Sequence, residues 1–185
     1  MTQEKLRDTI WITRISRVKA ERRLLDKNSF IQGINIYYSC ITIIFSICSL
    51  LEVFKANDIL SIITVFMTIS LLITILYLNS LKYEDIARCY RDNYTDLYKL
   101  ELELGHDISS ERLASIEKEY CELLAASCNH ITYDYYCTIH EANDDFKKDK
   151  WKSIRHKYWF GYIWRLLVKV FTVLFPVGLC VLLLW

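Results

Sequence analysis

Residues 34–51, INIYYSCITIIFSICSLL, and residues 59–81, ILSIITVFMTISLLITILYLNSL, decide the fold of this chain. The first run has 18 residues and the second 23, and neither contains a charged side chain. At a rise of about 1.5 Å per residue, helices of these lengths extend about 27 and 35 Å, close to the ~30 Å hydrocarbon core of a bilayer. Because a soluble core helix seldom lacks a polar face over such a length, the pair predicts a membrane-spanning hairpin.

A third apolar run, residues 166–185, closes the chain and carries one charge, Lys169. Aromatic residues crowd its approach, as is typical where a span meets the membrane surface. The run predicts a third transmembrane segment over residues 163–185. The alternative is a helix lying flat in the interface, but residues 170–185 lack the polar face that such a helix needs.

The remainder of the chain is charged and has the pattern of helices. The 185 residues include four Gly and one Pro, and this lack of helix breakers favours an all-α fold. Residues 83–104 and 110–124 each carry an apolar stripe, and together they predict an antiparallel helical hairpin whose stripes favour self-association. Because residues 59–104 contain neither Gly nor Pro, we expect the second span to continue into this hairpin without a break.

Lysine and arginine are distributed unevenly about the spans. Eight precede residue 34, twelve lie in residues 82–162, and Lys55 alone lies between the first two spans. By the positive-inside rule, the N-terminal arm (1–33) and the helices of residues 82–162 are cytoplasmic, and the loop of the hairpin (34–81) lies outside. The formal net charge of +1 gives no reason to expect direct binding of nucleic acid.

One face of the first span carries small polar side chains at steps of four, three, four and three residues. They are Asn35, Ser39, Thr42, Ser46 and Ser49, and Glu52 follows three residues later. Such a face either allows close packing of membrane helices or lines a water-filled path in an oligomer. In the second case a ring of Glu52 carboxylates at the outer mouth would favour cations.

The N-terminal segment, residues 5–27, has the pattern of an amphipathic helix. Its apolar stripe consists of Trp11, Ile15, Val18 and Leu25. Its basic residues include Arg14, Arg17, Arg22 and Arg23. Basic residues beside a membrane usually contact anionic lipid head groups, and a binding site for an anionic ligand is the alternative.

Side chains that could carry chemistry are few. The candidate metal ligands are Cys121, Cys128, His130, Cys137 and His140, of which only the last two have a spacing typical of zinc sites. His130 and Asp134 share a helix face and predict a structural hydrogen bond, with an oriented acid–base pair as the alternative. The sequence therefore predicts a protein that is not an enzyme and needs no metal or cofactor, although a metal-dependent enzyme is a third hypothesis.

Several segments together resemble the SLATT family, the SMODS and SLOG-associating two-transmembrane effector domains. They are WITRISR (11–17), AERRL (20–24), NIYYS (35–39), the tight hairpin, the long charged helix after it, and Asn129-His130 followed by Asp134-Tyr135. The resemblance covers the chain to about residue 160, so that residues 1–162 form a SLATT-like domain. The third span is an extension beyond the two-span core.

This resemblance implies a bacterial inner-membrane effector of an antiphage system. Such a protein is expected to form an oligomeric pore that opens on a cytoplasmic signal and kills or arrests the infected cell. Its partners would be the lipid bilayer, further copies of the chain, and a separate activator: a nucleotide second messenger, a sensor protein or a reverse transcriptase. The rival hypothesis is a non-conducting anchor that recruits a partner protein through its cytoplasmic helices.

Overall fold

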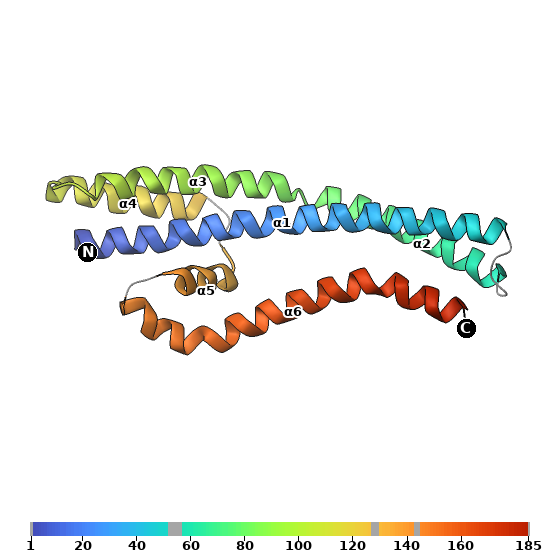
Figure 1. Ribbon diagram of the computed structural model, residues 1–185. Coiled ribbons are helices and arrows are strands. Elements are labelled where there is room, and N and C mark those ends of the chain that lie inside the picture. Colours follow the sequence, from blue (N-terminus) through green and yellow to red (C-terminus); the bar gives the residue numbers. More distant parts are fainter. Residues whose placement is uncertain (1, 52–56, 127–129, 143–144, 185) are drawn as a thin grey trace. The chain divides into compact units, whose positions relative to one another are not determined.

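The computed structural model describes residues 2–51, 57–126, 130–142 and 145–184. Within these residues the chain forms six α-helices and no strand, which confirms the all-α prediction (Figure 1). The helices are α1 (Gln3–Leu50), α2 (Asn57–Ser80), α3 (Tyr83–Glu103), α4 (Ser110–Ala126), α5 (Thr132–Glu141) and α6 (Asp145–Leu184).

The chain divides into two compact units, which we describe separately. The first, called the helical body, comprises Met1–Asp26 and Tyr83–Tyr162. The second, called the apolar unit, comprises Lys27–Lys82 and Ile163–Trp185. Helices α1 and α6 each contribute residues to both units.

The buried face of α1 in the helical body follows a regular heptad spacing. Its buried residues at alternating steps of four and three are Leu6, Ile10, Thr13, Arg17, Ala20 and Leu24. These steps keep one helix face toward its neighbours. The stripe expected from sequence, which runs from Trp11 to Leu25, lies beside this face and is only half-buried. The difference arises because Thr13 and Arg17 are buried although they are polar, so a search for apolar residues does not include them.

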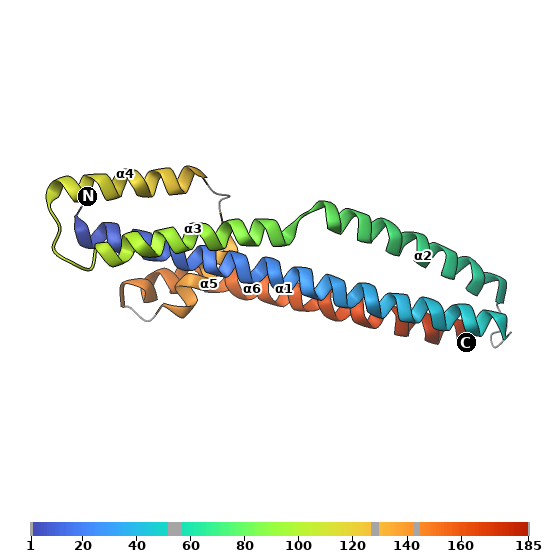
Figure 2. The same cartoon turned by 90° about the horizontal axis from the view of Figure 1, so that it is seen from above.

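Two apolar clusters hold α1, α3 and α4 together. The first consists of Leu6, Ile10, Leu97, Leu100, Leu104, Ile116 and Tyr120. The second consists of Ala20, Leu24, Ala87 and Tyr90. Helices α3 and α4 form the predicted antiparallel hairpin (Figure 2). The side-chain amide of Gln3 donates to the carbonyl oxygens of Leu104 and His106 at 3.0 and 2.7 Å, and so ties α1 to the turn of the hairpin.

The expectation of one unbroken helix across residues 59–104 is wrong. Helix α2 ends at Ser80 and α3 begins at Tyr83, with Lys82 between them at φ 45°. A side chain in the left-handed region cannot continue a right-handed helix. The local signal is weak: Asn79 and Ser80 are modest helix formers, and the Ser80 hydroxyl donates to the carbonyl oxygen of Tyr77 at 2.6 Å.

Three helical stretches are long and apolar enough to cross a membrane: Gln3–Leu50, Asp58–Glu103 and Trp151–Gly178. The second of them includes the break at Lys82. Large apolar side chains of these stretches are widely exposed, with Phe66 and Phe171 each at 69%. So much exposed apolar surface is unfavourable in water and suits a lipid environment. The stretches agree with the prediction of three apolar helices.

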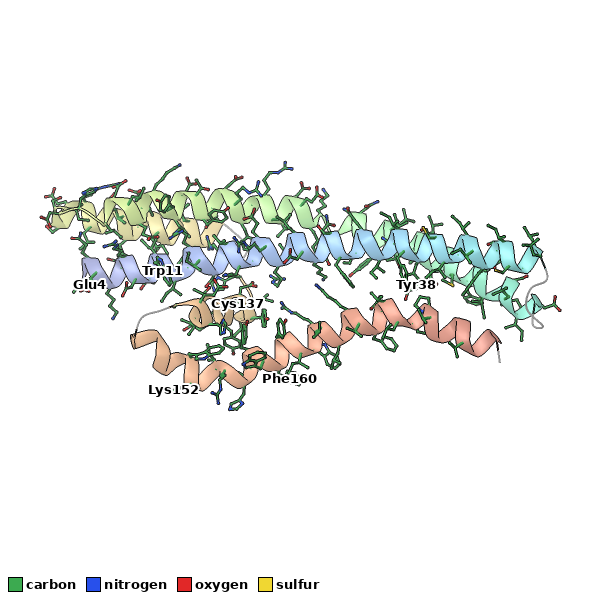
Figure 3. All side chains as sticks on the ribbon, viewed as in Figure 1. Glu4, Trp11, Tyr38, Cys137, Lys152 and Phe160 are labelled. Atoms are coloured by element: carbon green, nitrogen blue, oxygen red, sulfur yellow. The ribbon has the colours of Figure 1, made fainter. Side chains whose placement is uncertain are left out.

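The contact between α1 and α6 in the apolar unit explains how α6 accommodates a proline. Pro176 lies inside α6 and has no N–H, so the carbonyl oxygen of Thr172, four residues earlier, loses its helical donor. The hydroxyl of Tyr38 donates to that oxygen at 2.8 Å, from the side of α1 that faces α6 (Figure 3). Because an unpaired carbonyl is costly in an apolar environment, this bond stabilises the helix at its weak point.

We therefore expect Tyr38→Phe to destabilise the apolar unit by about 1–3 kcal/mol, the cost of leaving a buried acceptor unpaired. Pro176→Ala restores an N–H for the Thr172 oxygen, so the same substitution should cost less in that background. Unfolding of the four variants of this cycle in mixed micelles measures the coupling. Equal costs in both backgrounds would contradict the assignment. Tyr37→Phe is the control, because Tyr37 donates to the oxygen of Val173 and not of Thr172.

Candidate functional site

The polar face of α1 that the sequence singles out is divided among different surroundings. Asn35 lines a cleft in the apolar unit, Thr42 is buried at 9% exposure, and the hydroxyls of Ser49 and Ser61 lie 2.8 Å apart, so that Ser49 joins α1 to α2. Ser46 remains exposed. The Ser49 contact is the helix packing that sequence analysis offered as the alternative to a pore lining.

Three hydroxyls of this face are bonded within α1 itself. Ser39, Thr42 and Ser46 donate to the carbonyl oxygens four residues earlier, at 2.7, 2.8 and 2.9 Å. Such bonds satisfy the O–H donor inside an apolar environment and leave the hydroxyl oxygen able to accept a further bond. Glu52, the expected carboxylate at the outer end of this face, lies outside the described residues.

The cleft that contains Asn35 has a volume of about 470 Å³ and lies between α1, α2 and α6. Most of its lining is apolar, and its polar members are Asn35, Tyr38, Ser70, Thr74 and Thr172. Thr74 and Thr172 bond to carbonyl oxygens of their own helices. Within the described residues, the amide of Asn35 makes no side-chain hydrogen bond. An amide in a mostly apolar cleft favours a partner such as water or another chain.

The arginines expected to form a basic surface are mostly internal. Arg14 Nε lies 2.6 Å from Glu101 Oε2, and its guanidinium lies 5.1 Å from the centre of the Tyr98 ring. Arg23 binds both oxygens of Asp134, with Nε–Oδ1 at 2.8 Å and Nη2–Oδ2 at 3.1 Å. These pairs join α1 to α3 and to α5.

The remaining two arginines of this set differ completely in their surroundings. Arg22 lies on the surface, whereas Arg17 is 0% exposed. Arg17 Nη1 donates to the carbonyl oxygen of Leu123 at 3.3 Å, but its Nε and Nη2 have no hydrogen-bond partner among the described residues. Burial lowers the pKa of Arg17 from its ordinary value, because a charge is poorly solvated there.

Two further polar groups around Arg17 have unpaired atoms. Asn93 donates from Nδ2 to the same Leu123 oxygen at 2.9 Å, while its Oδ1 has no partner in the described part of the chain. His130 is half-buried, and its Nδ1 is likewise buried without a partner. Burial lowers the pKa of His130, and the charge of Arg17 lowers it further, against the opposing effect of Asp134. Arg17, Asn93 and His130 are therefore incompletely hydrogen-bonded within the described residues.

The residues considered for metal binding do not gather. In the ranges that the structure describes, no three His, Cys, Asp or Glu side chains come together in a way that could hold a metal ion. Cys128 lies outside these ranges. The Asp134 carboxylate is shared between Arg23 and the backbone N–H of Ile131 at 3.1 Å, where it caps α5. His130 therefore does not have this carboxylate as a dedicated acid–base partner.

Sequence reasoning missed an aromatic cluster where α5 meets the first part of α6. The ring of His140 stacks on Tyr158 with centroids 4.6 Å apart at 10°, and Trp151 meets His140 edge-on at 4.6 Å. Tyr133 stacks on the Tyr158 ring at 5.9 Å. A Cβ at Gly161 would lie 2.9 Å from the Tyr133 ring, so glycine allows α6 to approach α5. His140 thus serves helix packing.

One protein family matches nearly the whole chain. It is described as SMODS and SLOG-associating 2TM effector domain family 5, and the match covers residues 1–183. The matched range includes residues 163–183, which sequence analysis treats as a separate C-terminal segment. No curated protein and no solved structure matches the chain.

The ion pair between Arg23 and Asp134 generates a test of the helical body. Asp134 is 1% exposed, so Arg23→Gln leaves a buried carboxylate without its cation, and we expect a loss of about 3–5 kcal/mol in the free energy of unfolding. The neighbouring Arg22→Gln changes the same charge on the surface and should cost less than about 0.5 kcal/mol. Denaturant unfolding of the two variants measures the difference. Similar losses in both would contradict the structural role of the pair.

His130 generates a test of pH dependence. Its pKa in the folded protein lies below the ordinary 6.5, so under mildly acidic conditions the unfolded chain binds a proton that the folded protein does not. Stability is therefore expected to fall as pH drops below about 6.5. The fall should be shallower in His130→Gln, and unchanged in the control His156→Gln on the exposed surface. Thermal unfolding between about pH 5 and 8 measures these slopes.

Proposed function

The chain belongs to the family of SMODS and SLOG-associating 2TM effector domains, and from this membership we propose that it is a pore-forming membrane effector of a bacterial antiphage system. Copies of the chain assemble in the inner membrane with the N-terminus in the cytoplasm. A cytoplasmic signal opens a path for ions through the assembly. The resulting loss of membrane integrity stops or kills the infected cell.

The observation that supports a pore most directly is the exposed hydroxyl of Ser46 in the apolar unit. Ser46 lies on the face of α1 that also carries Thr42, and the apolar residue next to it in sequence, Ile47, is exposed as well. Its donor is bonded to the Thr42 oxygen at 2.9 Å, and its own oxygen can accept a bond from water. A ring of such positions in an oligomer would give a narrow polar path among apolar helices.

Continuity of α1 supports a route from the signal to this path. A single helix without a break, Gln3–Leu50, carries both the buried residues of the helical body and the polar face of the apolar unit. The second connection, between α2 and α3, is interrupted at Lys82 and is less suited to transmit a rotation. A shift of α1 in the helical body is thus the simplest way to change its polar face.

The activator is a separate molecule in this proposal. The family name associates these domains with SMODS and SLOG signalling proteins, which agrees with a nucleotide second messenger or a sensor protein as the source of the signal. A neighbouring reverse transcriptase is a further candidate. No residue of the chain is assigned a catalytic role.

A second candidate function is a membrane anchor that recruits a protein partner without conducting ions. The supporting observation is an open cleft of about 410 Å³ along α3 and the end of α4, in the helical body. Its charged lining residues are Asp85, Arg88, Asp92 and Asp96. Mainly acidic side chains around an open surface suit a basic protein segment.

Charge reversal at these aspartates should abolish toxicity if the chain is an anchor that recruits a partner. It should leave conduction unchanged if the chain forms a pore.

The pore hypothesis predicts that Ser46→Leu lowers ion flux through the activated assembly by at least about tenfold, because an apolar side chain removes a polar position from a narrow path. Ile47→Leu, at the next exposed position of α1, is the matched control and should leave the flux unchanged. Membrane depolarisation in cells that carry the native activator measures the effect. Normal depolarisation by Ser46→Leu, at equal membrane abundance, would contradict a pore lined by this face.

A further inference from the structure

Arg17 stands out in the helical body because it is fully buried while the nearby carboxylates bind other arginines. Glu21, one helical turn further along α1, pairs with Arg91 at 2.6 Å. Asp134 binds Arg23, and Glu101 binds Arg14. Glu21, Asp134 and Glu101 thus each bind another arginine. A fully buried guanidinium in this position is costly unless an anion accompanies it.

The geometry of the unpaired atoms identifies the kind of anion. In a guanidinium, Nε and Nη2 lie on one edge and direct two parallel N–H bonds, which matches two oxygens of a carboxylate or phosphate. Arg23 uses this same edge for both oxygens of Asp134, at 2.8 and 3.1 Å. In Arg17 these are the two atoms without a partner among the described residues, while Nη1 is bonded to the Leu123 oxygen.

His130 is a second group with an unpaired nitrogen. Its Nδ1 is buried without a partner among the described residues, although the residue as a whole is half-buried. Burial lowers the pKa of His130, and the charge of Arg17 contributes in the same direction, so the two side chains interact electrostatically. An oxyanion between them would accept bonds from the arginine edge and from the imidazole, in the neutral tautomer with a proton on Nδ1 or in the charged form.

We propose that Arg17 and His130 form an oxyanion site in the helical body that binds a phosphate group, either free or carried by a small molecule. Phosphate is favoured over a simple carboxylate because it offers a third oxygen for the imidazole in addition to the two for the arginine edge. The aspartates of the cleft along α3 would repel an anion on that side. The site is defined by binding alone; its use as the receptor for the activating signal rests on the proposed function.

Such a site would link binding to α1. A phosphate at Arg17 fixes a residue in the middle of the buried face of α1, between Thr13, bonded to the Tyr120 hydroxyl at 2.9 Å, and Ala20 in the second apolar cluster. Neutralising the buried charge strengthens the packing of α1 against α4, because α4 supplies the carbonyl oxygen that Arg17 binds. A ligand that stabilises one position of α1 in this way can shift the populations of two states.

The experiment titrates the full chain in detergent micelles with inorganic phosphate, adenosine monophosphate or acetate. Binding is read from the change in melting temperature. Phosphate, adenosine monophosphate or both should raise the melting temperature saturably, and the two arms separate a free phosphate from one carried by a nucleotide. Arg17→Met should remove the response while melting at or above the wild-type temperature without ligand, because a buried unpaired charge is gone. Arg17→Lys keeps the charge but not the two-atom edge and should bind about tenfold more weakly.

Arg22→Gln, which removes an exposed arginine of the same helix, is the control and should bind like the wild type. A wild-type measurement covers the case in which Arg17→Met does not fold: phosphate should shift one arginine Nε signal in a nitrogen-15 spectrum. No saturable response to any probe, a response retained in Arg17→Met, or no shifted Nε signal at high phosphate would each overturn the site. Conduction enters neither measurement, so a protein that binds without conducting refutes the proposed function and not the site.

Discussion

The buried heptad face of α1 is the constraint on which the helical body depends. At six positions from Leu6 to Leu24 this one face supplies apolar contacts to α3 and α4, together with polar contacts to α4. A face of this kind tolerates polar residues only where a partner meets them. Thr13 finds the Tyr120 hydroxyl, and Ser16, beside the heptad, lies 3.0 Å from the Thr138 hydroxyl. The register of α1 against three helices is therefore fixed by specific hydrogen bonds as well as by burial.

The two units differ in how their polar groups in apolar surroundings are hydrogen-bonded. In the apolar unit, a carbonyl oxygen that Pro176 leaves without a donor is met by Tyr38 from another helix, and serine and threonine donors close onto their own backbone. In the helical body, Arg17 keeps two donors unpaired within the described residues, although paired arginines lie on the same helix. Among the described residues few other buried side-chain polar atoms lack a partner, which is why the proposed oxyanion site is centred on Arg17.

Much of this architecture follows from local patterns in the sequence. Length and absence of charge predict the apolar helices, and the stripes around Tyr90 and Ile116 predict the hairpin of α3 and α4. The break at Lys82 escapes such reasoning, because neither Gly nor Pro marks it and a single left-handed residue ends the helix. The arginines of α1 escape it for a different reason. Their partners, Glu101 and Asp134, are distant in sequence. When the helix is considered alone, Arg14 and Arg23 therefore look like part of a basic surface, whereas in the fold they form ion pairs.

The same limit applies to the polar face of the first span. Spacing alone places Asn35, Thr42 and Ser49 on one side of a helix, but only the fold shows that Ser49 meets Ser61 while Ser46 remains exposed. Some side chains of this polar face make contacts within the chain. The face could therefore line a water-filled path only where its exposed side chains meet those of other copies. Any rotation of α1 changes which members those are, because residues one position apart lie about 100° apart around a helix. In the proposed function, a shift of α1 at Arg17 would therefore change which hydroxyls of its polar face are exposed.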